Sequence, residues 1–211
     1  MRAHFCFQQA NFGKLCGVMT AAVPQLILAS ASPRRRDLLG SLGLEFTVVP
    51  SDIDETPYPD EAAPALVERL SRAKAEAVAA DHANALVIAA DTVVVLDEAI
   101  LGKPKDENEN RHFLERLAGR DHEVYTGHAL VYQRRSVVAT PKTVVRFRDL
   151  SSAEIDRYVA TGEGLDKAGG YAIQGYGAAL VPRVEGCYFN VVGLSLATLV
   201  ELAAELGVAL V

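Results

Sequence analysis

Apolar residues form two kinds of segment along this chain: short continuous runs, and longer stretches in which they recur at helical spacing. Residues 26–29 and 85–96 are almost continuously apolar, which is the pattern of strands covered on both faces. Across residues 65–80 the apolar positions recur on one side, which predicts an amphipathic helix. Residues 124–132 and 137–147 indicate two long strands that pair around the turn between them.

Cap and turn residues mark out the remaining elements. We expect further helices over residues 33–42, 105–117, 151–162 and 194–206, further strands over 45–49 and 178–184, and a glycine-rich loop over 162–177. Strands and helices mingle without a regular strand–helix–strand repeat. The sequence therefore predicts an α/β fold built on a mixed β-sheet with flanking helices.

Composition narrows the class of ligand. Half of the 211 residues are hydrophobic, yet no segment approaches the roughly 20 uninterrupted apolar residues that cross a bilayer. The net charge is -6, so the chain as a whole repels nucleic acid, and an anionic ligand has to be held by a local basic cluster. A small anionic substrate fits this balance better than a nucleic acid polymer or a membrane.

The N-terminal segment and the cysteines bear on organisation and compartment. Residues 1–24 lack the apolar core and cleavage site of an export signal, and we expect a poorly ordered extension followed by a single domain over 25–211. The chain has 3 cysteines, an odd number without metal-ligand spacing, which argues against a disulfide framework and for a reducing compartment. These features predict a cytoplasmic location.

The segment LILASASPRRRDLL carries the strongest local signal in the chain. Ser32 can cap the helix that follows and Pro33 can take its first position, so Arg34, Arg35 and the next arginine fall in the first helical turn. Cations are unfavourable there because the helix dipole is already positive, unless an anion lies among them. The cluster predicts a polyphosphate ligand, and the alternative is a set of solvated surface arginines.

Asp91 interrupts the apolar run over residues 85–96, with Thr92 beside it. An ionised carboxylate in a buried strand raises the free energy of the folded state unless it is paired or binds a metal. The alternative is an aspartate at a strand end that accepts a bond from a neighbouring backbone N–H. Thr92 either orients a ligand or fills an ordinary β position.

Glu55 belongs to an acidic, proline-bounded loop that also contains Asp52 and Asp54. Acidic loops are usually solvated surface. Clustered carboxylates are also the ligands that Mg²⁺ prefers, and this ion typically takes one or two protein carboxylates while substrate phosphates supply further oxygens. The loop is therefore a candidate cation site.

Two lysines are candidate phosphate contacts. Lys74 lies on the predicted amphipathic helix, where a lysine is more often solvated than bound to a ligand. Lys103 is the stronger candidate, because Gly102 and Pro104 hold it on a rigid turn after the long central strand, and a fixed ammonium stabilises charge on phosphate oxygens better than a mobile one. For Lys103 the alternative is ordinary turn chemistry.

The motifs SPRRRD, SDIDET, ADTVVV, LGKP, TGHALV, DKAGGYAIQG and VVGLSL follow one another in this order and resemble those of the Maf family of nucleoside triphosphate pyrophosphatases. The resemblance implies a bent sheet with two lobes around a central cleft, as in inosine triphosphatases. It also implies that Asp91 is the proton acceptor and that Glu55 binds the metal. The residues to which it assigns substrate binding or specificity are Ser32, Arg34, Arg35, Lys74, Thr92, Lys103 and Gln174.

The segment DKAGGYAIQG resembles the branch of the family that acts on dTTP and UTP. Gln174, within it, has an amide with both a donor and an acceptor, which suits the edge of uracil or thymine. The resemblance thus implies house-cleaning hydrolysis of dTTP, UTP and modified pyrimidine nucleotides to the monophosphate and pyrophosphate. It further implies a divalent cation, Mg²⁺ or Mn²⁺, and a homodimer.

Two other functions stay open at this point. One is a pyrophosphatase for 7-methyl-GTP or inosine-type purine nucleotides. The other is a nucleotide-sensing regulator of cell division that binds without turnover.

Overall fold

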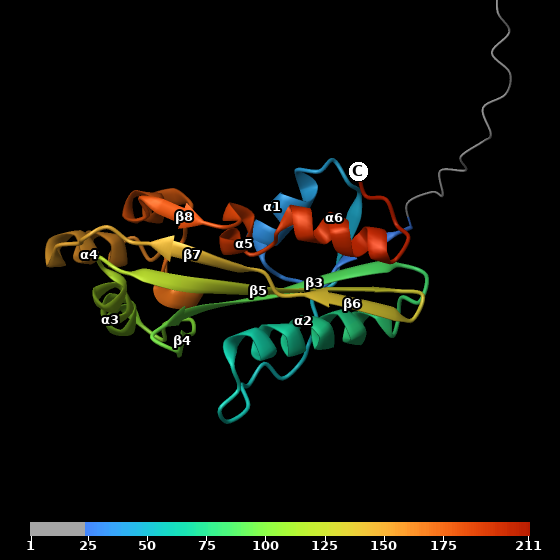
Figure 1. The fold of residues 1–211 in the computed structure, drawn as a ribbon, viewed down its shortest axis with the longest axis horizontal. Helices are drawn as coiled ribbons and strands as arrows, with labels where there is room; N and C mark the ends of the chain where they lie inside the picture. Colours follow the sequence, from blue (N-terminus) through green and yellow to red (C-terminus); the bar gives the residue numbers. More distant parts are fainter. Residues whose placement is uncertain (1–23) are drawn as a thin grey trace, which may run out of the picture.

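A mixed β-sheet extends along the molecule and carries helices on both of its faces (Figure 1). The structure is a computed structural model that describes residues 24–211. Within this range the strands are β1 Leu26–Leu28, β2 Phe46–Val48, β3 Leu86–Leu96, β4 Ala99–Leu101, β5 Asp121–Tyr132, β6 Arg135–Ala139, β7 Lys142–Arg146 and β8 Arg183–Glu185. The α-helices are α1 Pro33–Gly40, α2 Ala63–Ala79, α3 Glu107–Leu117, α4 Ser152–Val159, α5 Tyr188–Val192 and α6 Leu196–Glu205, and two 3₁₀ helices are η1 Ala168–Gly170 and η2 Gly175–Leu180. The α/β class predicted from the sequence is confirmed.

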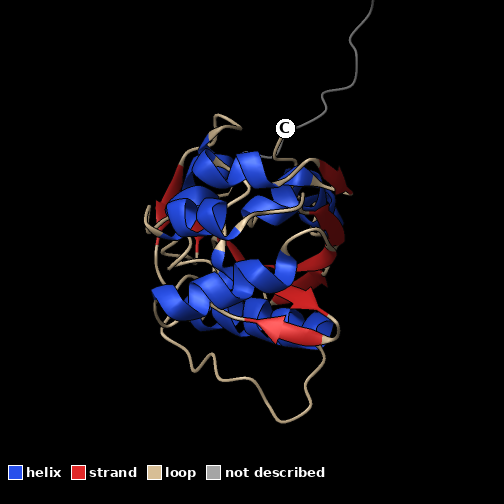
Figure 2. Cartoon of the chain, turned by 90° about the vertical axis from the view of Figure 1, so that its left-hand side faces the viewer, coloured by secondary structure: helices blue, strands red, loops and turns tan. Residues whose placement is uncertain are grey.

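Helix α2 covers one face of the sheet, whereas α1, α5 and α6 lie on the other (Figure 1). Seen along the molecule, helices lie in layers above and below (Figure 2). Gly127 of β5 allows α2 to approach closely, because a Cβ there would lie 2.1 Å from the Val67 carbonyl oxygen. On the opposite face the core contains Leu39 of α1, Leu130 of β5 and Leu199 of α6, all fully buried.

Along one edge of β3, its two partner strands β1 and β4 leave a gap between them. The first residues of β3 pair in parallel with β1, up to Leu28 opposite Ile88. The last residues pair antiparallel with β4, starting at Val94 opposite Leu101. Along the other edge β5 is paired throughout this stretch. Among the described residues, 89–93 therefore have no strand partner on the first edge, and Asp91 lies in the middle of this gap.

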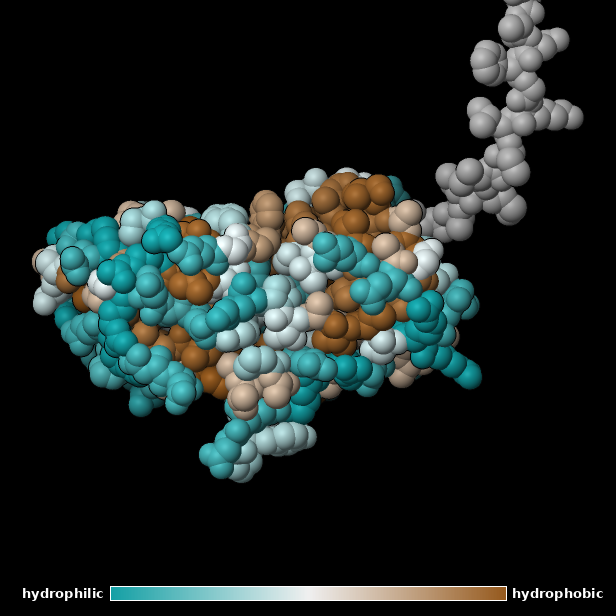
Figure 3. Space-filling view, viewed as in Figure 1, coloured by the Kyte–Doolittle hydropathy of each residue, from teal (hydrophilic) through white to brown (hydrophobic). Residues whose placement is uncertain are grey.

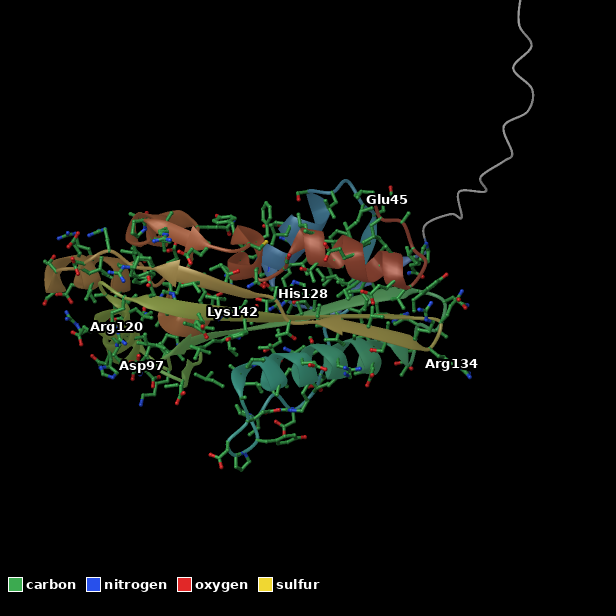
Figure 4. All side chains as sticks on the ribbon, in the orientation of Figure 1. Glu45, Asp97, Arg120, His128, Arg134 and Lys142 are labelled. Atoms are coloured by element: carbon green, nitrogen blue, oxygen red, sulfur yellow. The ribbon has the colours of Figure 1, made fainter. Side chains whose placement is uncertain are left out.

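Strands β3 and β5 join the two ends of the molecule. Figure 4 labels Arg134, in the turn after β5, at one end, and Asp97 and Arg120, which follow β3 and precede β5, at the other. An ion pair joins Asp97 and Arg120 at 2.5 Å. His128 lies near the middle, below α6 (Figure 4). Both ends of the molecule are thus built on the same two strands.

Two sequence-based expectations about the elements were wrong in detail, and some elements were not expected at all. The strand expected over 137–147 is two strands, β6 and β7, separated by Thr140 and Pro141, since proline lacks the N–H that a central ladder requires. The strand expected over 178–184 begins within the helix η2, and only its last two residues belong to a strand, β8. The sequence did not predict β4 or α5. The strong hairpin between β5 and β6 was expected and is confirmed.

The expected N-terminal extension, apart from its last residue, lies outside the described residues. In the described part of the chain, no helix is both long enough and apolar enough to span a membrane.

Candidate active site

A cleft of about 620 Å³ opens at the gap in the edge of β3. Its walls come from the start of α1, the loop before α2, helix α2 itself, β3, the turn after β4 and the glycine-rich segment before η2. The site residues expected from the sequence all line it: Ser32, Arg34, Arg35, Glu55, Lys74, Asp91, Thr92, Lys103 and Gln174. Residues from six separate parts of the chain are therefore brought to one place.

The guanidinium group of Arg35 is half-buried in the cleft wall and has no carboxylate partner among the described residues. Its Nε–H donates to the Gly193 carbonyl at 2.9 Å, and its other nitrogens donate to Ser30 Oγ at 3.3 Å and Thr92 Oγ1 at 3.1 Å. Within residues 24–211 no acidic side chain forms an ion pair with it, and burial lowers its pKa. A half-buried cation that is held only by neutral oxygens and lines a cleft indicates an anionic ligand.

The start of α1 has the geometry that the sequence predicts. Ser32 is the N-cap, and its hydroxyl accepts the Arg35 backbone N–H at 3.5 Å. Pro33 occupies the first turn, which contains no acidic residue. Arg34 lies 3.6 Å from Asp166 of the glycine-rich segment, and both side chains remain partly exposed. The positive end of the helix and two arginines thus face the cleft together.

Lys74 joins the two candidate carboxylates. Its Nζ lies 2.5 Å from Asp91 Oδ1 and 3.0 Å from Glu55 Oε1. Lys74 and Asp91 are buried, at 7% and 8% exposure, whereas the Glu55 side chain is 56% exposed. Asp91 therefore has the charged partner that its burial requires. Lys74, from α2, holds Asp91 of β3 and Glu55 of the preceding loop at one point.

Glu55 is the carboxylate of this pair that can meet a hard cation shared with the substrate. Its side chain is exposed, whereas Asp91 is buried and its Oδ1 is paired with the Lys74 ammonium. No cluster of three or more acidic, histidine or cysteine side chains suited to a metal occurs in residues 24–211. A single carboxylate is still compatible with Mg²⁺, which typically takes only one or two from the protein when phosphates complete its shell.

Arg69 of α2 anchors the loop that contains Glu55. Its guanidinium binds Glu61 through two bonds of 2.6 and 2.7 Å and donates to the Thr56 carbonyl at 3.2 Å. It also lies 4.0 Å from the centre of the Tyr58 ring. The bond with Arg69 lowers the pKa of Glu61 to about 2. The sequence analysis did not single out Arg69, because its partners all lie in an irregular loop.

Two lysines face the cleft from the far side. Lys103 is exposed in the turn after β4, and the carbonyl of Gly102 beside it accepts the Gly169 N–H at 3.0 Å. Lys167, which the sequence analysis missed, donates to the Glu163 carbonyl at 2.6 Å and to Asp166 at 2.5 Å. Its place in DKAGG, before two glycines, was the available signal.

Thr92 acts within the protein as well as lining the cleft. Its Oγ1 accepts a bond from Arg35 and lies 3.0 Å from Thr126 Oγ1, which donates to the Asn190 carbonyl at 2.8 Å. Because the Thr126 proton is used in that bond, Thr92 donates to Thr126. Thr126 and Asn190 are fully buried, and sequence reasoning identified neither. We call the chain Arg35–Thr92–Thr126–Asn190 the threonine relay.

The profile of the family described as Maf-like protein matches residues 25–206 of this chain. The dTTP/UTP pyrophosphatase of Myxococcus xanthus is 52% identical over 192 residues, which cover 91% of this chain and 97% of that protein. The dTTP/UTP pyrophosphatase of Moorella thermoacetica is 53% identical over 186 residues, which cover 87% of this chain and 96% of that protein. The dTTP/UTP pyrophosphatase of Deinococcus radiodurans is 50% identical over 186 residues, which cover 88% of this chain and 94% of that protein. A solved structure, the Staphylococcus aureus Ham1 protein, overlaps with a TM-score of 0.45 and 16% identity, over 74% of this chain and 79% of that one.

Proposed function

This chain belongs to the Maf family, and we propose that it hydrolyses dTTP and UTP to the nucleoside monophosphate and pyrophosphate. Relatives about half identical over most of this chain bear the name dTTP/UTP pyrophosphatase. The observation that carries the proposal is the half-buried Arg35 guanidinium, which has no carboxylate partner in the described chain and lies in the same cleft as Asp91.

The first role of the site is to bind a triphosphate. Arg35 uses three of its nitrogens on neutral protein oxygens, and its remaining N–H groups are available to phosphate. Arg34 and Lys103 add charge at the cleft walls, and the first turn of α1 adds backbone N–H groups. These donors are fixed before the substrate arrives, so they stabilise charge that develops on the phosphates without rearranging.

Asp91 is the proposed proton acceptor for the attacking water. Lys74 holds its Oδ1 at 2.5 Å and so fixes the orientation of the carboxylate. The second Asp91 oxygen has no hydrogen-bond partner among residues 24–211 and is the atom that would take the proton. The proton goes from water to this oxygen as the α-phosphate is attacked, and pyrophosphate leaves.

Glu55 would hold a divalent cation, Mg²⁺ or Mn²⁺, whose remaining ligands are phosphate oxygens. When bound, such an ion polarises the phosphates and lowers the pKa of a coordinated water. In this arrangement the Lys74 ammonium remains next to both carboxylates and offsets the repulsion between their negative charges.

Gln174 is the proposed contact for the base. It is exposed at the cleft wall, and its amide has no hydrogen-bond partner among the described residues. An amide can accept from N3–H and donate to O4 of uracil or thymine at the same time. A purine specificity stays an alternative outcome of the test below.

We also propose that the protein is a cytoplasmic homodimer, as the resemblance implies. Apolar residues gather at the surface near α6 (Figure 3), which supports an interface there. Sedimentation of the purified chain at several concentrations tests the dimer.

The test of the function is a panel of nucleoside triphosphates incubated with the protein and Mg²⁺ or Mn²⁺. We expect pyrophosphate and monophosphate from dTTP and UTP, and far slower release from purine nucleotides. The Asp91→Asn variant should lose about 10²- to 10⁴-fold in turnover, as is typical when a general base is removed, while still binding UTP. Orthophosphate as the sole product would contradict cleavage between the α- and β-phosphates, and binding without turnover would favour a sensor.

A further inference from the structure

Glu163 connects the two ends of the glycine-rich segment. Its backbone carbonyl accepts the Lys167 Nζ at 2.6 Å. Its carboxylate accepts the N–H of Tyr176 at 3.0 Å through Oε1 and the N–H of Gly177 at 2.9 Å through Oε2. One residue thus holds both a cleft-lining lysine and the first turn of η2, which directly follows Gln174.

The carboxylate acts as a remote cap for η2. The first N–H groups of a helix have no partner within it, and a carboxylate that accepts two of them forms bonds stronger than those between neutral groups. Gly175 has a φ of +63°, and a Cβ there would lie 2.1 Å from Glu163 Oε1. The Glu163 carboxylate therefore fixes the course of the backbone after Gln174. It also leaves no room for a side chain at the next position, which is Gly175.

The orientation of Gln174 matters for a specific chemical reason. Uracil presents N3–H and O4, whereas cytosine presents N3 and an amino group, so the donor and acceptor positions are exchanged. An amide that is free to rotate can pair with either base, because it has one donor end and one acceptor end. Rotation of the amide alone exchanges these two ends, so discrimination requires a backbone position at which only one orientation of the amide fits the cleft.

We propose that Glu163 is a positioning residue that sets the pyrimidine selectivity of the site by fixing the backbone at Gln174. This inference rests on the proposed function, because it takes Gln174 as the base contact. Glu163 itself touches neither phosphate nor base in this scheme. Its loss should let the segment shift and so weaken the preference for UTP over CTP more than it weakens triphosphate binding.

The experiment measures kcat/KM for pyrophosphate release from UTP and from CTP in the full chain and in the Glu163→Gln variant. The ratio of the two values does not depend on how much of the sample is folded. We expect the UTP/CTP ratio to fall about tenfold or more in Glu163→Gln, since an amide cannot accept both N–H bonds equally. Gly175→Ala, which displaces the same carboxylate from the other side, should lower the ratio as well.

Glu154→Gln is the matched control. Glu154 also accepts a backbone N–H, from Ser151 at 2.9 Å, and pairs with Arg148, but it caps α4 rather than η2. We expect it to lose stability without a change in the UTP/CTP ratio. An unchanged ratio in both Glu163→Gln and Gly175→Ala overturns the inference, whereas absence of pyrophosphate release by the unaltered protein overturns the proposed function itself.

Discussion

Replacing Thr126 by valine tests whether the threonine relay holds Arg35 in place. The substitution keeps the shape of a fully buried side chain but removes its hydroxyl. Two bonds are lost: the one to the Asn190 carbonyl, at 2.8 Å, and the one from Thr92, at 3.0 Å. A net value near 1 kcal/mol for one bond and about 2 kcal/mol for an unpaired buried carbonyl give a loss of about 3 kcal/mol in the free energy of unfolding.

The same substitution should also weaken substrate binding in the cleft, because Thr92 contacts both Thr126 and Arg35. Once its hydroxyl has lost its acceptor, Thr92 can rotate away from Arg35, whose NH2 group it holds at 3.1 Å. If half of the free energy of a charged hydrogen bond is lost, about 1 kcal/mol, UTP binding weakens about fivefold. We would follow unfolding in urea by circular dichroism and measure KM and UTP affinity together. Thr126→Ser keeps the hydroxyl and should restore both.

Two results would refute this reasoning. A Thr126→Val protein with normal stability would mean that the buried bonds contribute nothing. A destabilised protein with unchanged UTP affinity would mean that Arg35 does not depend on the threonine relay.

Three further predictions follow from the same structure. Arg69→Met should release the loop that contains Glu55 and raise the half-saturating Mg²⁺ concentration several-fold, measured by Mg²⁺ titration of activity, with little change in turnover at saturation. Gly127→Ala should cost about 3 kcal/mol, measured in urea, because its Cβ would collide with the backbone of α2. Burial lowers the pKa of His122 and His128 to about 4, so the unfolded chain binds more protons between pH 6.5 and 4, and stability should fall as pH falls through that window, by at most roughly 3 kcal/mol per histidine in urea titrations. A flat stability profile in that window would contradict the last of these.

Features that depend on local chemistry were predictable from the sequence. Ser32 and Pro33 start a helix because their own side chains favour that position, and Asp91 was conspicuous because its strand is otherwise apolar. The burial of Lys74 was also predictable from its helical spacing, although the sequence analysis considered a solvated side chain more common at such a position. Lys74 continues a row at four-residue spacing through Leu66 and Leu70, so it points toward the same buried face as these leucines.

Features that depend on distant contacts were not predictable. The bond between Arg35 and Thr92 joins residues 57 positions apart, and the one from Thr126 to the Asn190 carbonyl spans 64. No local pattern distinguishes such a threonine from one that fills a β position. Helix α5 was missed for a similar reason, since a five-residue helix is formed by the strands it packs on rather than by its own spacing.

The continuity of β3 and β5 past the cleft has a consequence for motion and for engineering. A sharp bend at one point would break hydrogen bonds between β3 and β5, which pair continuously from Val87 to Val95. The shared ladder therefore resists a hinge motion there, and gradual twisting of these strands or movement of the rim loops costs less free energy as a way to close over bound substrate. Separating the two ends at the cleft would cut both strands and divide the ladder that joins them.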